Sequence, residues 1–227
     1  MQEKETQMRK DIHCFSGSTL KMIALASMTI DHVAYYVMGN IMGFQGSWQY
    51  DCLREVGRLA FPIFAFLVVE GYRHTHNLKR YMAVLFMAAI ISEIPWLLLG
   101  QYDSHNVLFT LLFGLITISM TDTVPFNSWL KVVPLCIISL LSAWLNTDYS
   151  WHGIGLMIVF FLFKDNPFLC FLFGFPFLME YGIVGTSCGI FICLCYNGSR
   201  GFIKGGWLKY AFYLYYPLHL LVICCFA

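Results

Sequence analysis

Charged residues are scarce in this sequence: Asp, Glu, Lys and Arg together make up only 12% of its 227 residues. Soluble domains carry about 25% of these residues, whereas hydrophobic residues reach 59% here. The apolar residues recur in long blocks separated by short polar joints, which is typical of a protein that crosses a membrane several times. The formal net charge of +1 by itself says nothing about nucleic acid. From the apolar blocks we expect the lipid bilayer, and no nucleic acid, as a partner.

Metal-binding and disulfide patterns are also missing. The nine cysteines form no CxxC pair and no Cys/His arrangement with the spacing of a metal site. Most of them lie inside apolar blocks, where a free cysteine behaves as a small hydrophobe. We therefore expect neither a disulfide framework nor a bound metal.

Long linkers, low-complexity tracts and internal repeats are absent as well. Their absence favours a single transmembrane domain over residues 1–227, with residues 1–19 as a cytoplasmic N-terminal segment. Because this first segment is polar and mixed in charge, we expect no cleavable signal peptide ahead of the first apolar block. Residues 20–42 would themselves act as the insertion signal.

The apolar blocks predict an all-α, polytopic integral membrane helix bundle around a central polar cavity. We expect about nine transmembrane helices, within a range of about eight to ten. Several are short or broken, because Pro167, Pro176 and Gly182 interrupt the second half of the chain, and broken helices often line a cavity. The expected spans are residues 20–42, 57–72, 81–99, 106–121, 131–145, 152–163, 167–180, 183–196 and 209–226.

The basic residues orient these spans. If the amino terminus is cytoplasmic, the opposite side receives only Arg54 and Arg58. The cytoplasmic ends and loops then collect Lys4, Arg9, Lys10, Lys21, Arg73, Lys79, Arg80, Lys131, Lys164, Arg200, Lys204 and Lys209. This asymmetry follows the positive-inside rule and favours an odd number of spans. We therefore expect a multi-pass membrane protein with a cytoplasmic amino terminus.

The first span carries ionisable groups that an ordinary transmembrane helix avoids. Lys21 lies near its start, and Asp31 and His32 lie past its middle. Lys21 and His32 are about three helical turns apart, so both lie on one face of the helix. Charged or titratable groups at membrane depth are costly and normally face a cavity or a partner. We interpret Asp31 and His32 as functional, the alternative being a histidine that is hydrogen-bonded across helices.

The last span places His219 at a depth similar to that of His32, with Tyr216 and Pro217 just before it. Two histidines at one level predict a shared polar site if the first and last helices meet. Other ionisable residues have a structural alternative, because ion pairs also hold membrane helices together. The pairs in question are Arg58 with Asp31 or Glu93, and Glu70 with Arg73 or Lys79.

Five stretches together resemble the TraX family, the F-pilin acetylase-like proteins of bacterial conjugation. They are LKMIALASMTIDH (20–32), GRLAFPIFAFLVVEGYRHTHN (57–77), HNVLFTLLFG (105–114), YNGSRG (196–201) and KYAFYLYYPLHLL (209–221). They follow the family's order over nearly the whole chain. The spacing from Lys21 to His32 is also similar to the basic-x10-His signature of the wider membrane acyltransferases, the acyltransferase-3 superfamily.

This resemblance implies an acetyl-CoA-dependent acyltransferase of the bacterial cytoplasmic (inner) membrane. The acetyl group would pass to an amino or hydroxyl group of a membrane-delivered acceptor, such as the amino terminus of a pilin-like peptide, or of a small molecule. The superfamily's catalytic histidine carries over to His32, and its basic residue carries over to Lys21.

A mechanism can be built on these residues. The phosphates of acetyl-CoA need basic partners, and Lys21, Arg73, Lys79 and Arg80 can supply them at the inner mouth. His32 would act either as a general base or through a transient acetyl-histidine. Asp31, which points about 100° away around the helix, would pair with Arg58 or with a group on another helix. The candidates for binding the acceptor or polarising the carbonyl are Arg58, Glu70, Asn106, Tyr216 and His219.

Two other functions stay open. A proton-coupled transporter would use a path of ionisable side chains, namely Asp31, His32, Glu70, Glu93 and His219. The small number of acidic residues at depth and the lack of repeat symmetry argue against it. The other alternative is a non-catalytic membrane subunit that assists pilus or secretion assembly.

Overall fold

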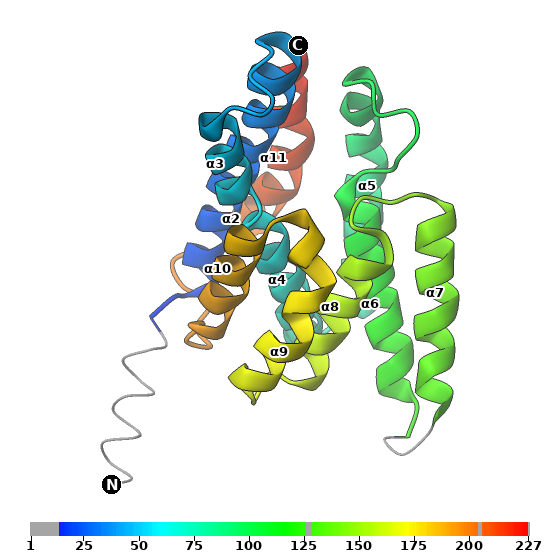
Figure 1. Ribbon diagram of the computed structural model, residues 1–227. Coiled ribbons are helices and arrows are strands. Elements are labelled where there is room, and N and C mark those ends of the chain that lie inside the picture. Colours follow the sequence, from blue (N-terminus) through cyan, green and yellow to red (C-terminus); the bar gives the residue numbers. More distant parts are fainter. Residues whose placement is uncertain (1–13, 126–128, 204–205, 227) are drawn as a thin grey trace, which may run out of the picture.

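The computed structural model describes residues 14–125, 129–203 and 206–226. Within these ranges the chain is all-helical and contains no β-strand (Figure 1). Most of the predicted N-terminal segment therefore lies outside the described residues, as do Lys4, Arg9, Lys10 and Lys204.

The helices follow the predicted spans closely. They are α2 (Gly17–His32), which continues as the π-helix η1 (Val33–Ile41), α3 (Trp48–Gly57), α4 (Ala60–His74), α5 (Leu78–Leu98), α6 (Val107–Thr123), the 3-10 turn η2 (Trp129–Lys131), α7 (Val132–Trp144), α8 (Ser150–Leu162), α9 (Pro167–Leu178), the 3-10 turn η3 (Met179–Tyr181), α10 (Ile183–Leu194) and α11 (Gly206–Cys224). Each predicted span contains a helix. Helix α3 was not predicted, because its sequence WQYDCLREVG is too polar to stand out as an apolar block.

Side-chain caps explain where several helices begin. The Oγ of Ser16 accepts a hydrogen bond from the backbone N–H of Thr19 at the start of α2. Asn77 caps α5 and Asn166 caps α9 in the same way, and Pro167 occupies the first turn of α9. These residue types are strongly preferred at such positions, since they satisfy backbone donors that have no partner inside the helix.

Helix α4 lies at the centre of the molecule, in contact with α2, α8 and α10 (Figure 1). Helices α2 and α11 lie side by side on one flank, and α6 and α7 form the opposite flank. The core around α4 consists of fully buried apolar side chains, among them Ile63, Leu115 and Leu156. Gly57 at the end of α3 allows a close approach to α2, because a Cβ there would collide with the side chain of Asp31.

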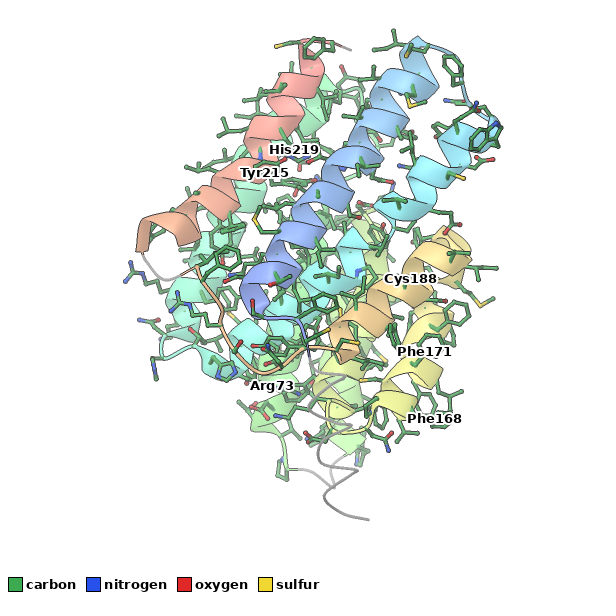
Figure 2. The ribbon with its side chains drawn as sticks, turned by 90° about the vertical axis from the view of Figure 1, so that its left-hand side faces the viewer. Arg73, Phe168, Phe171, Cys188, Tyr215 and His219 are labelled. Carbon is green, nitrogen blue, oxygen red and sulfur yellow. The ribbon has the colours of Figure 1, made fainter. Side chains whose placement is uncertain are left out.

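Large apolar side chains cover the outside of this bundle as well as its core. Large apolar side chains point outward from α5, α7 and α9: Ile94 is 63% exposed, Leu140 71% and Phe168 72%. Figure 2 shows Phe168, Phe171 and Cys188 on the outer side of α9 and α10. An apolar surface of this extent marks contact with a membrane or with another protein.

Helix length sets a limit on the predicted topology. In the described parts of the chain, only α5 is both long enough and apolar enough to cross a membrane by these two criteria. Helices α7 to α10 have 12 or 13 residues each, fewer than the ~20 residues that a perpendicular span needs. Helix α2 and η1 continue into each other over residues 17–41 and together reach spanning length.

Candidate functional site

Two histidines on neighbouring helices form the centre of the candidate site. The Nδ1 of His32, the last residue of α2, lies 2.7 Å from the Nε2 of His219 on α11. The first and last helices therefore meet, as the prediction of a shared histidine site required. Figure 2 shows the position of His219 on α11, beside α2.

Aromatic rings surround this histidine pair. The ring of Tyr216 meets both imidazoles edge-on, with centroid distances of 6.2 Å to His32 and 5.4 Å to His219. Tyr215 stacks on His219 at 5.3 Å, and its hydroxyl lies 2.7 Å from the Oγ1 of Thr29 on α2.

Both helices are irregular at this level. Helix α2 changes to a π-helix directly after His32, and the bond from Met42 N–H to the Val37 carbonyl, 3.1 Å long, spans five residues. Pro217 on α11 has no backbone N–H to donate to the preceding turn. π-Helical segments inside helices are rare and often coincide with functional sites.

A cavity of about 610 Å³ approaches the histidine pair from one end of the bundle. It lies between α2, α4, α5, α6 and α11, and follows α2 from Lys21 to Met28, a rise of about 10 Å. Its walls are apolar along most of this length, and Tyr216 lies at the far end. His32 follows Met28 by one helical turn. His32 itself does not line the cavity, but its imidazole meets the ring of Tyr216, which does.

The mouth of this cavity is basic. Four residues that are positively charged or can become so line it, namely Lys21, His74, Arg80 and Arg200. Arg80 also donates to the Tyr210 hydroxyl at 3.0 Å, and the Nζ of Lys21 lies 5.5 Å from the centre of the Phe212 ring. Lys21 and Arg80 are thus placed together as the sequence predicted.

The Tyr216 hydroxyl is the notable polar group of the cavity. The residue is only 5% exposed, and its hydroxyl makes no hydrogen bond to any described residue. Val107, whose backbone N–H belongs to the first turn of α6, also lines the cavity.

Arg73 and Lys79, which were predicted to bind the donor's phosphates, do not line this cavity. Arg73 forms an ion pair with Glu70 at 2.8 Å and donates to the Phe161 carbonyl at 2.7 Å. It thereby neutralises Glu70 and holds α4 against the end of α8. Lys79 is exposed at the surface.

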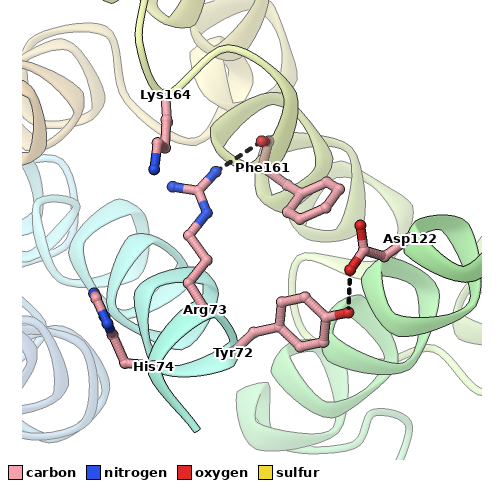
Figure 3. A pocket seen from close by; sticks show the side chains of 6 residues that line it. All are labelled: Tyr72, Arg73, His74, Asp122, Phe161 and Lys164. Atoms are coloured by element: carbon pink, nitrogen blue, oxygen red, sulfur yellow. Dashed lines mark hydrogen bonds between the residues drawn. The ribbon is translucent and has the colours of Figure 1, made fainter. Parts of the chain in front are cut away.

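Arg73 instead faces a second, more open cavity of about 550 Å³ (Figure 3). Lys164 lies close to the Arg73 guanidinium there, and the Tyr72 hydroxyl donates to Asp122 at 2.7 Å. In this cavity Arg73 is already bonded to Glu70 and to the end of α8.

Asp31 turns toward α3 and not toward the imidazole of His32. Its carboxylate pairs with Arg54 at 2.8 Å, so the partner is a group on another helix and the expected partner Arg58 is wrong. Arg58 donates instead to the Tyr149 hydroxyl at 3.2 Å. Burial raises the pKa of the Asp148 carboxyl, in the loop before α8, to about 6, and Arg58 opposes this effect.

Comparison with known proteins gives the family. The profile of the TraX protein family matches residues 16–227. The chain belongs to the TraX family. It is similar to a probable fimbrial assembly protein, FimC of serogroup H1, from Dichelobacter nodosus, at 29% identity over 241 residues that cover 92% of this chain and 95% of that protein.

A second relative of this TraX-family chain is an uncharacterized protein of Rickettsia prowazekii. It is 27% identical over 159 residues, which cover 66% of this chain and 58% of that protein. No solved structure matches the chain.

Asn106, a predicted substrate-binding residue, is fully committed to the fold. Its Oδ1 caps α6 by accepting from Leu108 N–H at 3.1 Å. Its Nδ2 donates to Glu93 at 2.5 Å and to the Ala89 carbonyl at 2.9 Å. Since His105 occupies the other oxygen of Glu93 at 2.5 Å, this cluster has little capacity left for a substrate.

Arg200 is the residue of this site that the sequence interpretation missed. The Ser18 Oγ donates to the Arg200 carbonyl at 2.7 Å and accepts from the Ile203 N–H at 2.9 Å. These bonds hold the loop after α10 against the start of α2, next to Lys21. The position of Arg200 within the matching stretch YNGSRG was the signal that could have found it.

Proposed function

We propose that this chain is an integral-membrane acyltransferase that moves an acetyl group from acetyl-CoA to an amino or hydroxyl group of an acceptor. The observation that carries the proposal is the cavity with a basic mouth at one end and the histidine pair, behind Tyr216, at the other. The axial distance from Lys21 to His32 is about 16 Å, which is comparable to an extended pantetheine arm.

The apolar exterior supports a polytopic arrangement in the bacterial cytoplasmic membrane. Outward-facing side chains such as Leu140 and Phe168 suit contact with lipid. The charged pairs of Asp31 with Arg54 and of Glu70 with Arg73 are instead at most 19% exposed. The basic mouth around Lys21 and Arg80 would face the cytoplasm, by the positive-inside rule, where acetyl-CoA is made available.

The donor's phosphates would bind at the mouth, and its thioester would lie among the apolar walls. Phosphate groups are held most strongly by charge-assisted hydrogen bonds. Arg80 and Arg200 offer guanidinium groups for this purpose, and Lys21 offers an ammonium group. We no longer assign Arg73 or Lys79 to the donor, because their side chains lie elsewhere.

Transfer would proceed by general-base catalysis. The acceptor nitrogen or oxygen forms a bond to the thioester carbonyl carbon, while the Nε2 of His32 takes the proton that this atom loses. The C–S bond then breaks, the electron pair leaves with the sulfur of CoA, and the imidazolium returns its proton to that sulfur. The products are the acetylated acceptor, free CoA and neutral His32.

Tyr216 and Val107 would stabilise the negative charge that develops on the carbonyl oxygen. The Tyr216 hydroxyl is buried and without a hydrogen-bond partner among the described residues, so it can donate to that oxygen without breaking a bond. The Val107 N–H belongs to the first turn of α6, where backbone donors lack intrahelical acceptors.

The acceptor we propose is the amino terminus of a pilin-like peptide in the same membrane. The similarity to a protein named as a probable fimbrial assembly protein supports an acceptor that belongs to a surface fibre. Asp31 would contribute by holding α3 against α2 through Arg54.

The proposal is tested with the purified protein in lipid nanodiscs, supplied with radiolabelled acetyl-CoA and a pilin-like peptide. We expect label on the peptide with the wild type and none above background with His32→Ala. Equal turnover in both proteins would remove His32 from the mechanism. Dissipation of a pH gradient in proteoliposomes, without acetyl transfer, would favour the transporter alternative.

A further inference from the structure

The hydrogen bond of His219 to its own helix fixes which of its nitrogens carries the proton. The Nδ1 of His219 lies 3.0 Å from the backbone carbonyl oxygen of Tyr215. A carbonyl oxygen can only accept a hydrogen bond, so this Nδ1 is the protonated nitrogen. In the neutral ring the Nε2 of His219 is therefore a pure acceptor, and it faces His32.

The geometry between the two rings suits one in-plane hydrogen bond. Their planes are within 5° of parallel, and their centroids are 5.0 Å apart while the facing nitrogens are 2.7 Å apart. Rings stacked face to face do not approach to 2.7 Å, because nonbonded carbon atoms stay about 3.5 Å apart. The rings are thus arranged end to end, with the lone pair of one nitrogen directed at the proton of the other.

The hydroxyl groups of Thr29 and Tyr215 help to hold the ring of His219 in place. The Thr29 Oγ1 donates its single proton to the Leu25 carbonyl at 2.9 Å. The contact of 2.7 Å between Thr29 and Tyr215 must then use the proton of the Tyr215 hydroxyl. Tyr215 stacks on His219 within 13° of parallel, so α2 restrains this ring through Tyr215 on one face and through His32 at Nε2.

We propose that His219 is a positioning residue that holds His32 in the tautomer protonated at Nδ1 and unprotonated at Nε2. The functional consequence rests on the proposed acetyl transfer, in which Nε2 of His32 is the base. The Nε2 of His32 has no hydrogen-bond partner among the described residues, so its lone pair is available.

His219 would also stabilise the charged intermediate state of His32. When Nε2 of His32 takes a proton from the acceptor, the Nδ1–H bond to His219 becomes a charge-assisted bond, which is stronger than its neutral form. A third group that fixes the tautomer of a catalytic histidine and stabilises its imidazolium has the same role in hydrolytic triads. Here the acceptor is a neutral imidazole.

The test is the protonation pattern of His32 in the full-length protein in lipid, measured by solid-state NMR with 15N-labelled histidine. The chain has seven histidines, so the His32 signals are assigned by difference from a His32→Gln sample. We expect a protonated Nδ1 and an unprotonated Nε2 in the wild type at neutral pH. A proton on Nε2 would overturn the proposal without any variant.

Two variants with side chains of similar volume distinguish the loss of the hydrogen-bond acceptor at position 219 from a loss of packing. His219→Gln keeps an oxygen acceptor near the position of Nε2, and His219→Leu removes it. We expect His219→Gln to retain the tautomer and most of the activity. We expect His219→Leu to populate the Nε2–H tautomer of His32, and kcat to fall about 10- to 100-fold, a part of what a general base contributes.

The KM for acetyl-CoA should stay unchanged in both variants, because His219 does not line the donor cavity. An unaltered His32 tautomer in His219→Leu would overturn the proposal even if activity were lost. The expected tautomers in a protein that transfers no acetyl group would instead support the role of His219 and sink the proposed function.

Discussion

Two polar clusters in this molecule each contain histidine and differ in how many of their polar groups are hydrogen-bonded. Between α5 and α6, the carboxylate of Glu93 bonds to His105 on one oxygen and to Asn106 on the other, both at 2.5 Å. Between α2 and α11, His32 makes one hydrogen bond to the described residues, through Nδ1, and the Tyr216 hydroxyl makes none.

The difference favours a role beyond stability for the cluster between α2 and α11. Buried polar groups are normally hydrogen-bonded, and an unsatisfied one needs an explanation such as a catalytic role or a missing ligand. Glu93 and Asn106 need none, because they cap α6 and hold it against α5. The Tyr216 hydroxyl, which has no hydrogen-bond partner among the described residues, lines a cavity of about 610 Å³, and the ring of His32 lies against Tyr216.

Replacing the histidine of each cluster should give the largest difference between the two clusters, in activity and in unfolding temperature. His32→Gln should reduce acetyl transfer by about 1,000-fold, within the range of a general base, and should leave the unfolding temperature close to that of the wild type. The matched variant His105→Gln should lower the unfolding temperature and keep the activity per folded molecule. Peptide acetylation and thermal unfolding in nanodiscs measure both. A reversed pattern would mean that the functional cluster has been misassigned.

Removing the free hydroxyl should have the next largest effect. Tyr216→Phe should lower kcat about 100-fold, as the loss of one oxyanion donor does, without loss of stability, because the hydroxyl has no bond to lose. Tyr213→Phe, in the same cavity wall, is the control and should keep its kcat. Similar kcat values for the two variants would exclude Tyr216 as a donor to the carbonyl.

Removing positive charge from the mouth of the cavity should weaken the binding of acetyl-CoA and leave the rate of acetyl transfer unchanged. Lys21→Gln combined with Arg80→Gln should raise the KM for acetyl-CoA about 10-fold or more, since each charge-assisted bond to phosphate contributes about 1.5–3 kcal/mol. Lys79→Gln removes a charge outside the cavity and should leave KM within about twofold. Steady-state kinetics at varied donor concentration measure this. An equal rise in Lys79→Gln would indicate a general effect of charge.

The smallest effect on activity is expected in the satisfied cluster. Asn106→Ala should destabilise the protein by about 1–2 kcal/mol through the lost cap and leave kcat almost unchanged. Unfolding in a denaturant series measures this, with Asn166→Ala at the cap of α9 as a comparison. A large loss of kcat in the folded Asn106→Ala protein would restore Asn106 as a substrate-binding candidate.

The helices and the histidine pair could be predicted from sequence because both depend on position along a helix. Apolar blocks mark the helices, and the depth of His32 and His219 follows from their distance to the helix ends. Helix α3 has no such signal. The partner of Asp31 was consequently missed, since Arg54 lies on α3.

The sequence pattern could not predict contacts between segments that are far apart in the chain. The pairing of Glu70 with Arg73 was foreseen, since three residues separate them on one helix. The bond from Arg73 to the Phe161 carbonyl and the approach of Arg200 to Lys21 depend on how whole helices pack. Basic residues near a membrane surface also satisfy topology alone, so the sequence could not separate Arg80 from Arg73 or Lys79.

The most direct test of the central claim is to map where an acyl donor lies. An acyl-CoA with a photoreactive group in its acyl chain would be crosslinked to the wild type in nanodiscs, and the labelled peptides identified by mass spectrometry. We predict label in residues 25–36 and 212–219, competed away by acetyl-CoA. Label confined to the second cavity, around Arg73 and Lys164, or to the outer faces of α7 and α9, would contradict the proposed donor site.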